Sequence, residues 1–305
     1  MDLCDKMFMA NEATWKFEAL LRQLDKDGVD SSGCTVLNMA CRWGRLDVVE
    51  LLLRAGADIE KADLRGQTPL MAASGSLGNG HVKIAYALLC AGAQKNTKDH
   101  DGWTALSHAV WTMSKDAAGL LIRVGADVDA VVANGEPLLA HAVFQGSLGI
   151  CEMLLDAGAD INKTDVRGKT ALMTSLGRYD SEFIHLLLKR GADADRPSSN
   201  GVTPLMCACL QEWDAHVALL LLAGANIHKT DRDGHDASWF ARHKATRGSI
   251  DMLSRAYRRD ASAILLGLRA ADNPLSLLAG FDHVIKFIIA MALPNRILKS
   301  IPELL

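Results

Sequence analysis

The sequence predicts an all-α solenoid of helix-turn-helix units with β-hairpin loops, followed by a C-terminal helical extension. The main observation is a glycine that returns at a nearly constant spacing, at positions 33, 66, 102, 135, 168, 201 and 234. The successive separations are 33, 36, 33, 33, 33 and 33 residues, and three extra residues inside GSLGNGH (75–81) account for the longer one. A period of this length is typical of repeat architectures.

Each unit begins with a tight turn and a capped helix. Dipeptides such as Asp101-Gly102 and Asn200-Gly201 favour the positive φ of a hairpin turn. Two residues after the glycine stands a threonine suited to cap a helix, and the first helical position is proline in two units. These residues are Thr35, Thr68, Thr104, Thr170 and Thr203, with Pro69 and Pro204.

Two further positions in the unit predict how neighbouring units pack. A leucine stands four residues after the glycine (Leu37, Leu70, Leu106, Leu139, Leu172, Leu205). A small residue stands seven after it (Ala40, Ala73, Ala109, Ala142, Ser175, Ala208, Ala241). Residues three apart share a helix face, so small side chains there let helices approach closely. A second helix, such as DVVELLLRAG (47–56), ends at a glycine suited to a left-handed C-cap.

These units resemble ankyrin repeats. The phrases GQTPLMAA (66–73), GVTPLMCA (201–208), LLLRAGADIE (51–60) and MLLDAGADIN (153–162) are similar to that family's consensus, and the resemblance covers residues 33–257. It implies an ankyrin-repeat solenoid that binds proteins and needs no cofactor. In such folds, partners are met by the hairpin tips and by the exposed side of the first helices, which line a concave groove.

The ends of the chain depart from the pattern. Residues 1–32 are expected to form an N-terminal helical cap, and residues 33–257 seven repeats. The last repeat is degenerate, because Ser238 replaces the leucine and Tyr257 stands where Gly-Ala-Asp would begin. Residues 258–305 are expected to form a helical tail with many apolar residues. We expect this tail to cap the last repeat; docking a partner or forming an oligomer contact are the alternatives.

Composition narrows the class of protein. A net charge of −3 lacks the basic excess of a nucleic-acid-binding protein. Seven cysteines without C-x-x-C spacing, and an N-terminus unlike a signal peptide, favour a reduced, cytoplasmic protein. The most apolar run, VIKFIIAMAL (284–293), is too short to span a bilayer, so no stable membrane insertion is expected. The oligomeric state is not predicted.

The stretch DGWTALSHAVW (101–111) looks like an active site, but the repeat register argues against one. Ser107 and His108 are adjacent on a helix and point about 100° apart, so they would not face each other as nucleophile and base. Other units keep no nucleophile at the position of Ser107. We therefore predict no enzyme and reject a hydrolase that uses these residues.

No metal or cofactor is predicted. His108 and His141 occupy the same place in successive units, but a shared zinc lacks further ligands, so packed or hydrogen-bonded histidines are favoured. The set His228, His235 and His243 mixes hairpin and helix positions and is equally weak. DHDG (99–102) and DRDG (231–234) begin like calcium loops but lack the glutamate at position twelve, so their aspartates are interpreted as turn formers. GSLGNG (75–80) lacks a P-loop context and is expected to be an enlarged loop.

Exposed aromatic and arginine residues are the candidate partner-binding residues. Carried onto this sequence, the family's binding positions select Trp43, Arg65, Trp103, Trp111, Phe144, Arg167 and Arg178. Tryptophan and arginine are enriched at interface hot spots. The alternatives are that Trp111 and Phe144 pack under the next loop and that the arginines are solvated surface charges.

The leading hypothesis is a non-enzymatic module that sequesters, inhibits or positions a partner protein through its concave face. The alternative hypothesis is that the repeats target a tail, residues 258–305, with effector, membrane or oligomerisation activity.

Overall fold

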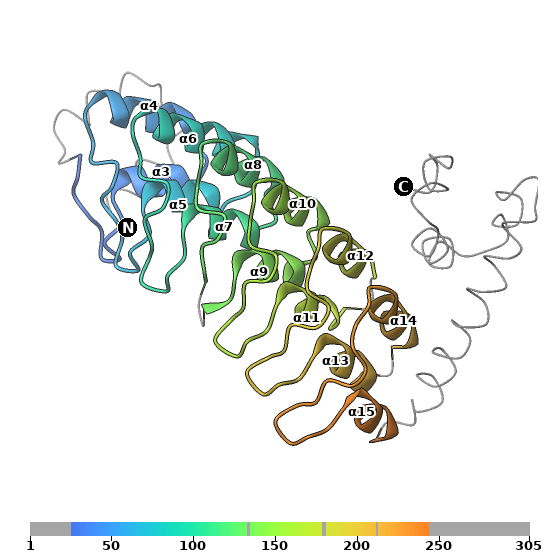
Figure 1. Cartoon of the computed structure of the whole chain (residues 1–305). Helices are drawn as coiled ribbons and strands as arrows, with labels where there is room; N and C mark the ends of the chain where they lie inside the picture. Colours follow the sequence, from blue (N-terminus) through green and yellow to red (C-terminus); the bar gives the residue numbers. More distant parts are fainter. Residues whose placement is uncertain (1–25, 133–134, 179–180, 212, 244–305) are drawn as a thin grey trace, which may run out of the picture. The chain divides into compact units, whose positions relative to one another are not determined.

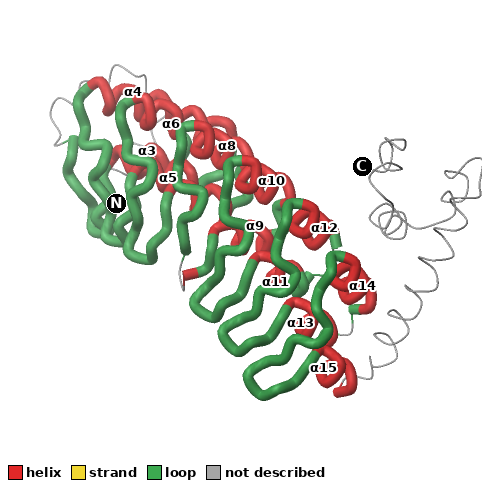
Figure 2. The backbone as a smooth tube through the Cα atoms, in the orientation of Figure 1, coloured by secondary structure: helices red, strands yellow, loops and turns green. Residues whose placement is uncertain are grey.

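The computed structural model describes residues 26–132, 135–178, 181–211 and 213–243. The first helices of successive repeats are α3 (Val36–Arg42), α5 (Pro69–Ser74), α7 (Ala105–Trp111), α9 (Leu138–Gln145), α11 (Ala171–Ser175), α13 (Pro204–Leu210) and α15 (Ala237–His243). The second helices are α4 (Leu46–Arg54), α6 (Asn79–Cys90), α8 (Lys115–Arg123), α10 (Leu148–Asp156), α12 (Glu182–Lys189) and α14 (Asp214–Leu222). Within these ranges the long connections are loops that carry only isolated β-bridges (Figure 2). The predicted all-α repeat fold is confirmed.

The chain divides into two compact units, residues 1–166 and 167–305. In the first unit, α3, α5, α7 and α9 pack side by side in one row, and α4, α6, α8 and α10 form a second row against them (Figure 1). In the second unit, α11, α13 and α15 form one row, and α12 packs on α14. In each unit, loops extend from the first-helix row on the side away from the second helices (Figure 1). We call the surface made by these loops and the first helices the hairpin-side surface.

The predicted turn and capping residues do what their positions require. All seven turn glycines have positive φ, from 70° at Gly135 to 82° at Gly102. Each of the five threonines accepts a hydrogen bond from the backbone N–H three residues later. In the fourth repeat the N-cap residue of α9 is Pro137, and this helix has no side-chain cap. In the seventh repeat Asp236 accepts from the Trp239 N–H, a cap that the sequence analysis did not identify.

The predicted core positions are confirmed. The six leucines are at most 2% exposed, and the seven small residues are fully buried. Small side chains therefore line the contact between neighbouring first helices, as in the contacts of α3 with α5 and of α5 with α7. This close packing supplies the apolar burial that stabilises each unit.

Neighbouring hairpins are joined by backbone hydrogen bonds. The N–H two residues before a turn glycine donates to the carbonyl of the preceding hairpin: Leu64 to Ser32, His100 to Arg65, Ser199 to Arg167 and Arg232 to Asn200, at 2.8–3.1 Å. The residue that makes this contact lies directly over the preceding turn glycine, where a Cβ would clash. The glycine is therefore required both by its φ and by the close approach of the next hairpin.

A second set of bonds between repeats was missed by the sequence analysis. Lysine ammonium groups donate to backbone carbonyls of the preceding repeat: Lys61 to Asp27, Lys163 to Asp129 and Lys229 to Asp195, at 2.6–3.0 Å. Aspartates in the same region accept from backbone N–H groups one repeat later, as Asp129 does from Asp160. Bonds to charged groups are stronger than neutral ones, so these contacts help to fix the register of the stack.

The prediction for residues 75–80 needs a correction. An enlarged loop was expected, but the loop between α5 and α6 spans only residues 75–78, and α6 has 12 residues where α4 has nine. The extra residues lengthen the helix instead. The added turn is anchored to the preceding repeat, because the His81 ring lies against Gly44 and its Nε2 is 3.2 Å from the Arg42 carbonyl oxygen.

Several predictions lie outside the described residues. These are most of the N-terminal cap (1–32), the end of the seventh repeat at Tyr257 and the tail (258–305). Within the described ranges, no helix has the length and apolar character needed to cross a membrane.

The double role of the turn glycines gives a first prediction. An alanine Cβ at Gly168 (φ +73°) would lie 2.5 Å from the Ser199 backbone nitrogen, whereas at Gly224 (φ +86°) nothing lies within 4 Å. We expect Gly224→Ala to cost about 1–2 kcal/mol of unfolding free energy for the left-handed φ alone. Gly168→Ala adds the collision, about 1–3 kcal/mol more. Urea unfolding followed by circular dichroism measures both; equal losses would contradict the close approach.

A buried histidine in the second unit is a source of pH-dependent stability. His216 on α14 is 4% exposed, its ring meets Trp213 edge-on at 4.7 Å, and its Nδ1 has no hydrogen-bond partner among the described residues. Burial lowers the pKa of its imidazole below the ordinary 6.5, and the nearby His185 lowers it further. Burial also lowers the pKa of His185, against an opposing effect of Glu182.

The sign of this effect gives a second prediction. Since the folded-state pKa of His216 is depressed, the unfolded chain binds more protons, and stability present above about pH 6.5 is lost as the pH falls. Phe183, buried at the same repeat position of α12, suggests the control variant His216→Phe. Between about pH 7.5 and 5.5, within the histidine titration range, the wild-type midpoint of urea unfolding should fall further than that of His216→Phe. Parallel pH profiles would show that His216 does not carry the effect.

Candidate functional site

Four aromatic side chains form one cluster on the hairpin-side surface of the first unit. Trp103 contacts the rings of His108, Trp111 and His141, with centroid distances of 5.5, 5.4 and 5.4 Å. Trp111 stacks on His141 at 5.5 Å, with the planes only 14° apart. The cluster joins the hairpin before α7 to the helices α7 and α9, so two successive repeats build it. We call Trp103, His108, Trp111 and His141 the aromatic cluster.

Asp99 holds one side of the aromatic cluster. One of its carboxylate oxygens accepts the backbone N–H groups of Asp101 and Trp103, at 3.1 and 2.8 Å. The other lies 3.0 Å from His108 Nε2. The turn-forming role predicted for Asp99 is confirmed, and the same carboxylate orients the His108 ring that contacts Trp103.

Glu136 holds the other side. Its Oε2 lies 3.0 Å from Nδ1 of His141, and the amide of Gln145 is 3.4 Å from Nε2 of the same ring. His141 is 4% exposed, while the Glu136 side chain is 31% exposed. The expectation of packed, hydrogen-bonded histidines is therefore confirmed, with a carboxylate as partner of each.

The apolar rings at this surface are open to solvent. Trp111 is 52% and Phe144 62% exposed. Phe144 follows His141 by three residues on α9 and so lies on the same helix face. Trp103 is half-buried among the other rings. The arrangement is a fixed platform of rings with an exposed apolar edge.

The other predicted residues of the first unit lie on the same side of the fold. Trp43 caps the end of α3 and is 48% exposed. Arg65 is exposed in the hairpin before α5, where its N–H donates to Asp63 and its carbonyl accepts from His100.

The two predicted arginines of the second unit differ in setting. Arg167 is exposed in the hairpin before α11, and its carbonyl accepts two bonds from Ser199. Arg178 is half-buried, with its guanidinium 5.2 Å from the ring centroid of Phe183. Arg178 thus makes a cation–π contact within its own repeat.

The serine and histidine of the apparent active site have separate partners. Ser107 is fully buried, and its hydroxyl lies 3.0 Å from Thr104 Oγ1. His108 is bonded to Asp99 instead. These two contacts explain both residues as parts of a helix cap and a hairpin, consistent with the register argument.

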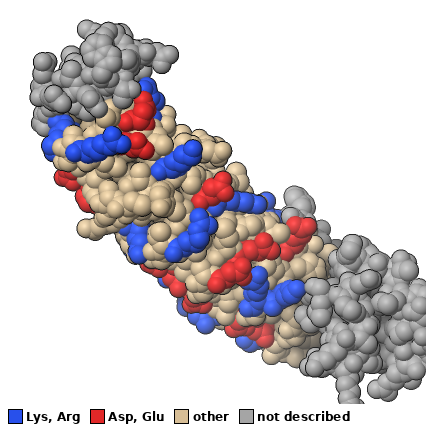
Figure 3. Space-filling model, turned by 90° about the horizontal axis from the view of Figure 1, so that it is seen from above, with Lys and Arg blue, Asp and Glu red and all other residues tan. Residues whose placement is uncertain are grey.

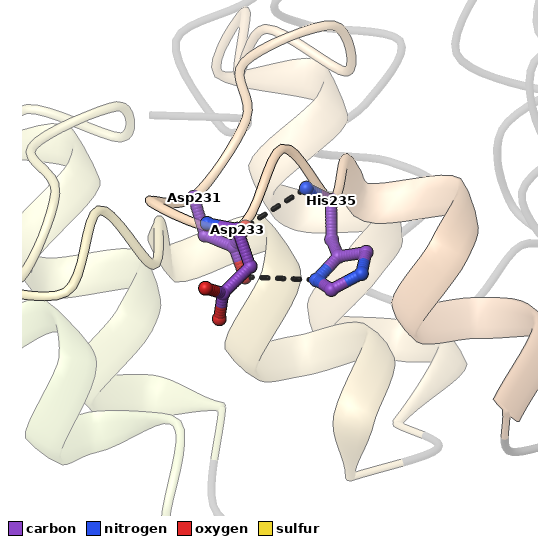
Figure 4. Close-up of side chains that lie close together, drawn as sticks. All are labelled: Asp231, Asp233 and His235. Atoms are coloured by element: carbon purple, nitrogen blue, oxygen red, sulfur yellow. Dashed lines mark hydrogen bonds and ion pairs between the residues drawn. The ribbon is translucent and has the colours of Figure 1, made fainter.

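A group of potential metal ligands lies in the second unit. Among the described residues, Asp231, Asp233 and His235 are the only set with ligand atoms within 4.8 Å of one another. Asp231 already accepts the N–H groups of Asp233 and His235, and its second oxygen is 3.5 Å from His235 Nδ1 (Figure 4). The group repeats the hairpin pattern of Asp99, so the turn geometry accounts for it.

The second-helix side of each unit carries charges of both signs (Figure 3). Viewed from above relative to Figure 1, Lys and Arg are interspersed with Asp and Glu (Figure 3). That view looks onto the second-helix side, where Tyr86 on α6 is 61% exposed. On the described part of this face neither sign of charge dominates. The exposed edge at Trp111 and Phe144 is instead apolar.

Comparisons with known proteins agree with the geometry. The chain is 37% identical over 94 residues to the glycerophosphocholine phosphodiesterase gde1 of Schizosaccharomyces pombe, covering 30% of this chain and 8% of that protein. It is 36% identical over 81 residues to mouse protein phosphatase 1 regulatory subunit 27, covering 27% and 51%. It therefore spans only part of the length of these curated relatives.

Among solved structures, the ankyrin repeat domain of Bcl-3 superposes with a TM-score of 0.66 at 24% identity, covering 72% of this chain and all of that one. The family model described as ankyrin repeats (3 copies) matches residues 7–99, 59–132, 78–165 and 139–231. These matches cover more than half of the chain, which therefore belongs to the ankyrin-repeat family.

Proposed function

We propose that this chain is a non-enzymatic protein-binding module that sequesters, inhibits or positions a partner protein through its hairpin-side surface. Ankyrin repeats serve as protein–protein interaction modules, which supports the class of function. The observation that carries the site is the exposed pair Trp111 and Phe144, set beside the aromatic cluster on two neighbouring repeats.

The bonds around the rings support binding at this place. Trp111 stacks on His141, which Glu136 orients, and Trp103 is held through its backbone by Asp99. Rings fixed before binding lose little conformational freedom when a partner arrives, and this lowers the cost of association. Exposed tryptophan on such a platform is typical of an interface hot spot.

The third prediction concerns this surface. Replacing Trp111 and Phe144 together by alanine should weaken partner binding strongly, because each hot-spot truncation costs about 2 kcal/mol or more. Partners are captured from a lysate, identified by mass spectrometry, purified, and titrated against both proteins by calorimetry. Both side chains are half or more exposed, so the double variant should keep its circular dichroism spectrum.

Tyr86→Ala is the matched control, since it removes an exposed aromatic ring from the second-helix row of the same unit. It should bind like the wild type. A partner that binds the Trp111→Ala, Phe144→Ala variant as tightly as the wild type would refute the proposed surface.

A further inference from the structure

We infer that the surface of Trp103, Trp111 and Phe144 binds a protein segment that presents a cationic side chain, arginine or lysine. This inference rests on the proposed function and narrows the chemistry of the partner at the same site. It follows from the charge that surrounds the exposed rings.

The repeats that carry these rings are poor in basic residues. The sequence has no Lys or Arg between Lys98 and Lys115, nor between Arg123 and Lys163. These two stretches contain α7 and α9 with the turns before them. The Lys115 ammonium lies near Gly149 of α10, in the second-helix row, since a Cβ added there would be 2.8 Å from it. Lys98 is exposed at the start of the Trp103 hairpin.

Two carboxylates are bonded to the histidine rings that contact the tryptophans. Asp99 is bonded to His108, which contacts Trp103, and Glu136 is bonded to His141, which contacts both tryptophans. Asp101 is exposed in the same turn. The site therefore combines indole rings with nearby negative charge.

Indole rings with nearby carboxylates suit a cationic side chain better than an acidic or an apolar one. Lysine and arginine are attracted to the face of tryptophan, and arginine also stacks on it. One face of Trp111 is covered by His141, and its 52% exposure leaves ring surface for such a contact. An acidic partner would be repelled by Glu136 and Asp101, and an apolar one would bring no opposite charge to these carboxylates.

The fourth prediction tests this with a defined probe. Random peptides displayed on phage are selected on the full wild-type chain at low salt and about pH 8, above the range in which histidines usually titrate. Enriched peptides should share an arginine or lysine. Synthetic copies in which citrulline replaces that arginine keep its shape without its charge, and should bind about tenfold more weakly.

Variants of the chain locate the effect. Glu136→Gln keeps an oxygen that can accept from His141 Nδ1 but loses the charge, so it should reduce the preference for arginine over citrulline. Glu50→Gln, an exposed carboxylate on α4, is the matched control and should leave that preference unchanged. Trp111→Ala with Phe144→Ala should abolish binding of the selected peptides.

The outcomes separate this inference from the proposed function. Selected peptides without a basic residue, or with equal affinity for the citrulline copy, overturn the inference; if they still fail to bind the Trp111→Ala, Phe144→Ala variant, the surface itself stands. Peptides that bind this variant as well as the wild type overturn both. A selection that enriches no peptide also overturns the inference, because a cationic segment should be found in such a library.

Discussion

The carboxylate of Asp99 is the contact on which the aromatic cluster depends. It is nearly fully buried, and it bonds two backbone N–H groups with one oxygen and His108 with the other. A buried charge is tolerated only when its oxygens are satisfied in this way. At Asp30, Asp63 and Asp231, too, one carboxylate oxygen accepts the backbone N–H groups two and four residues later. The pattern therefore belongs to the hairpin of this repeat type and not to one repeat alone.

The fixed hairpin before α7 determines where the exposed rings lie. Because the His100 N–H donates to the Arg65 carbonyl, the hairpin that carries Trp103 is fixed to its predecessor as well as to its own aspartate. Trp103 then has a defined position between two histidines, and Trp111 stacks on the second of them. Backbone geometry therefore sets the position of side chains that the repeat itself does not require.

The sequence predicted the residues that recur from repeat to repeat. It did not predict side-chain contacts that cross a turn. Glycine, threonine, leucine and alanine positions follow from the period and are confirmed. The partners of His108 and His141 stand nine and five residues away, across the turn and cap, where no helical or strand spacing indicates a contact. The inserted residues at the start of α6 looked like a loop because glycine is a poor helix former, yet packing of His81 on Gly44 favours helix.

The fourth repeat differs from the third in where the carboxylate bonded to its histidine lies. At the position of Asp99 this repeat has Val132, buried and bonded through its backbone to Glu136, and at the threonine position it has Pro137. The repeat thus lacks both the hairpin carboxylate and the capping hydroxyl. Its carboxylate comes from the residue after the turn glycine instead, and is 31% exposed where that of Asp99 is 4%. The carboxylate of Asp99, which holds its turn, is nearly fully buried. A partly exposed one beside Trp111 is available to a partner, and this is the physical basis for assigning a cation to the surface.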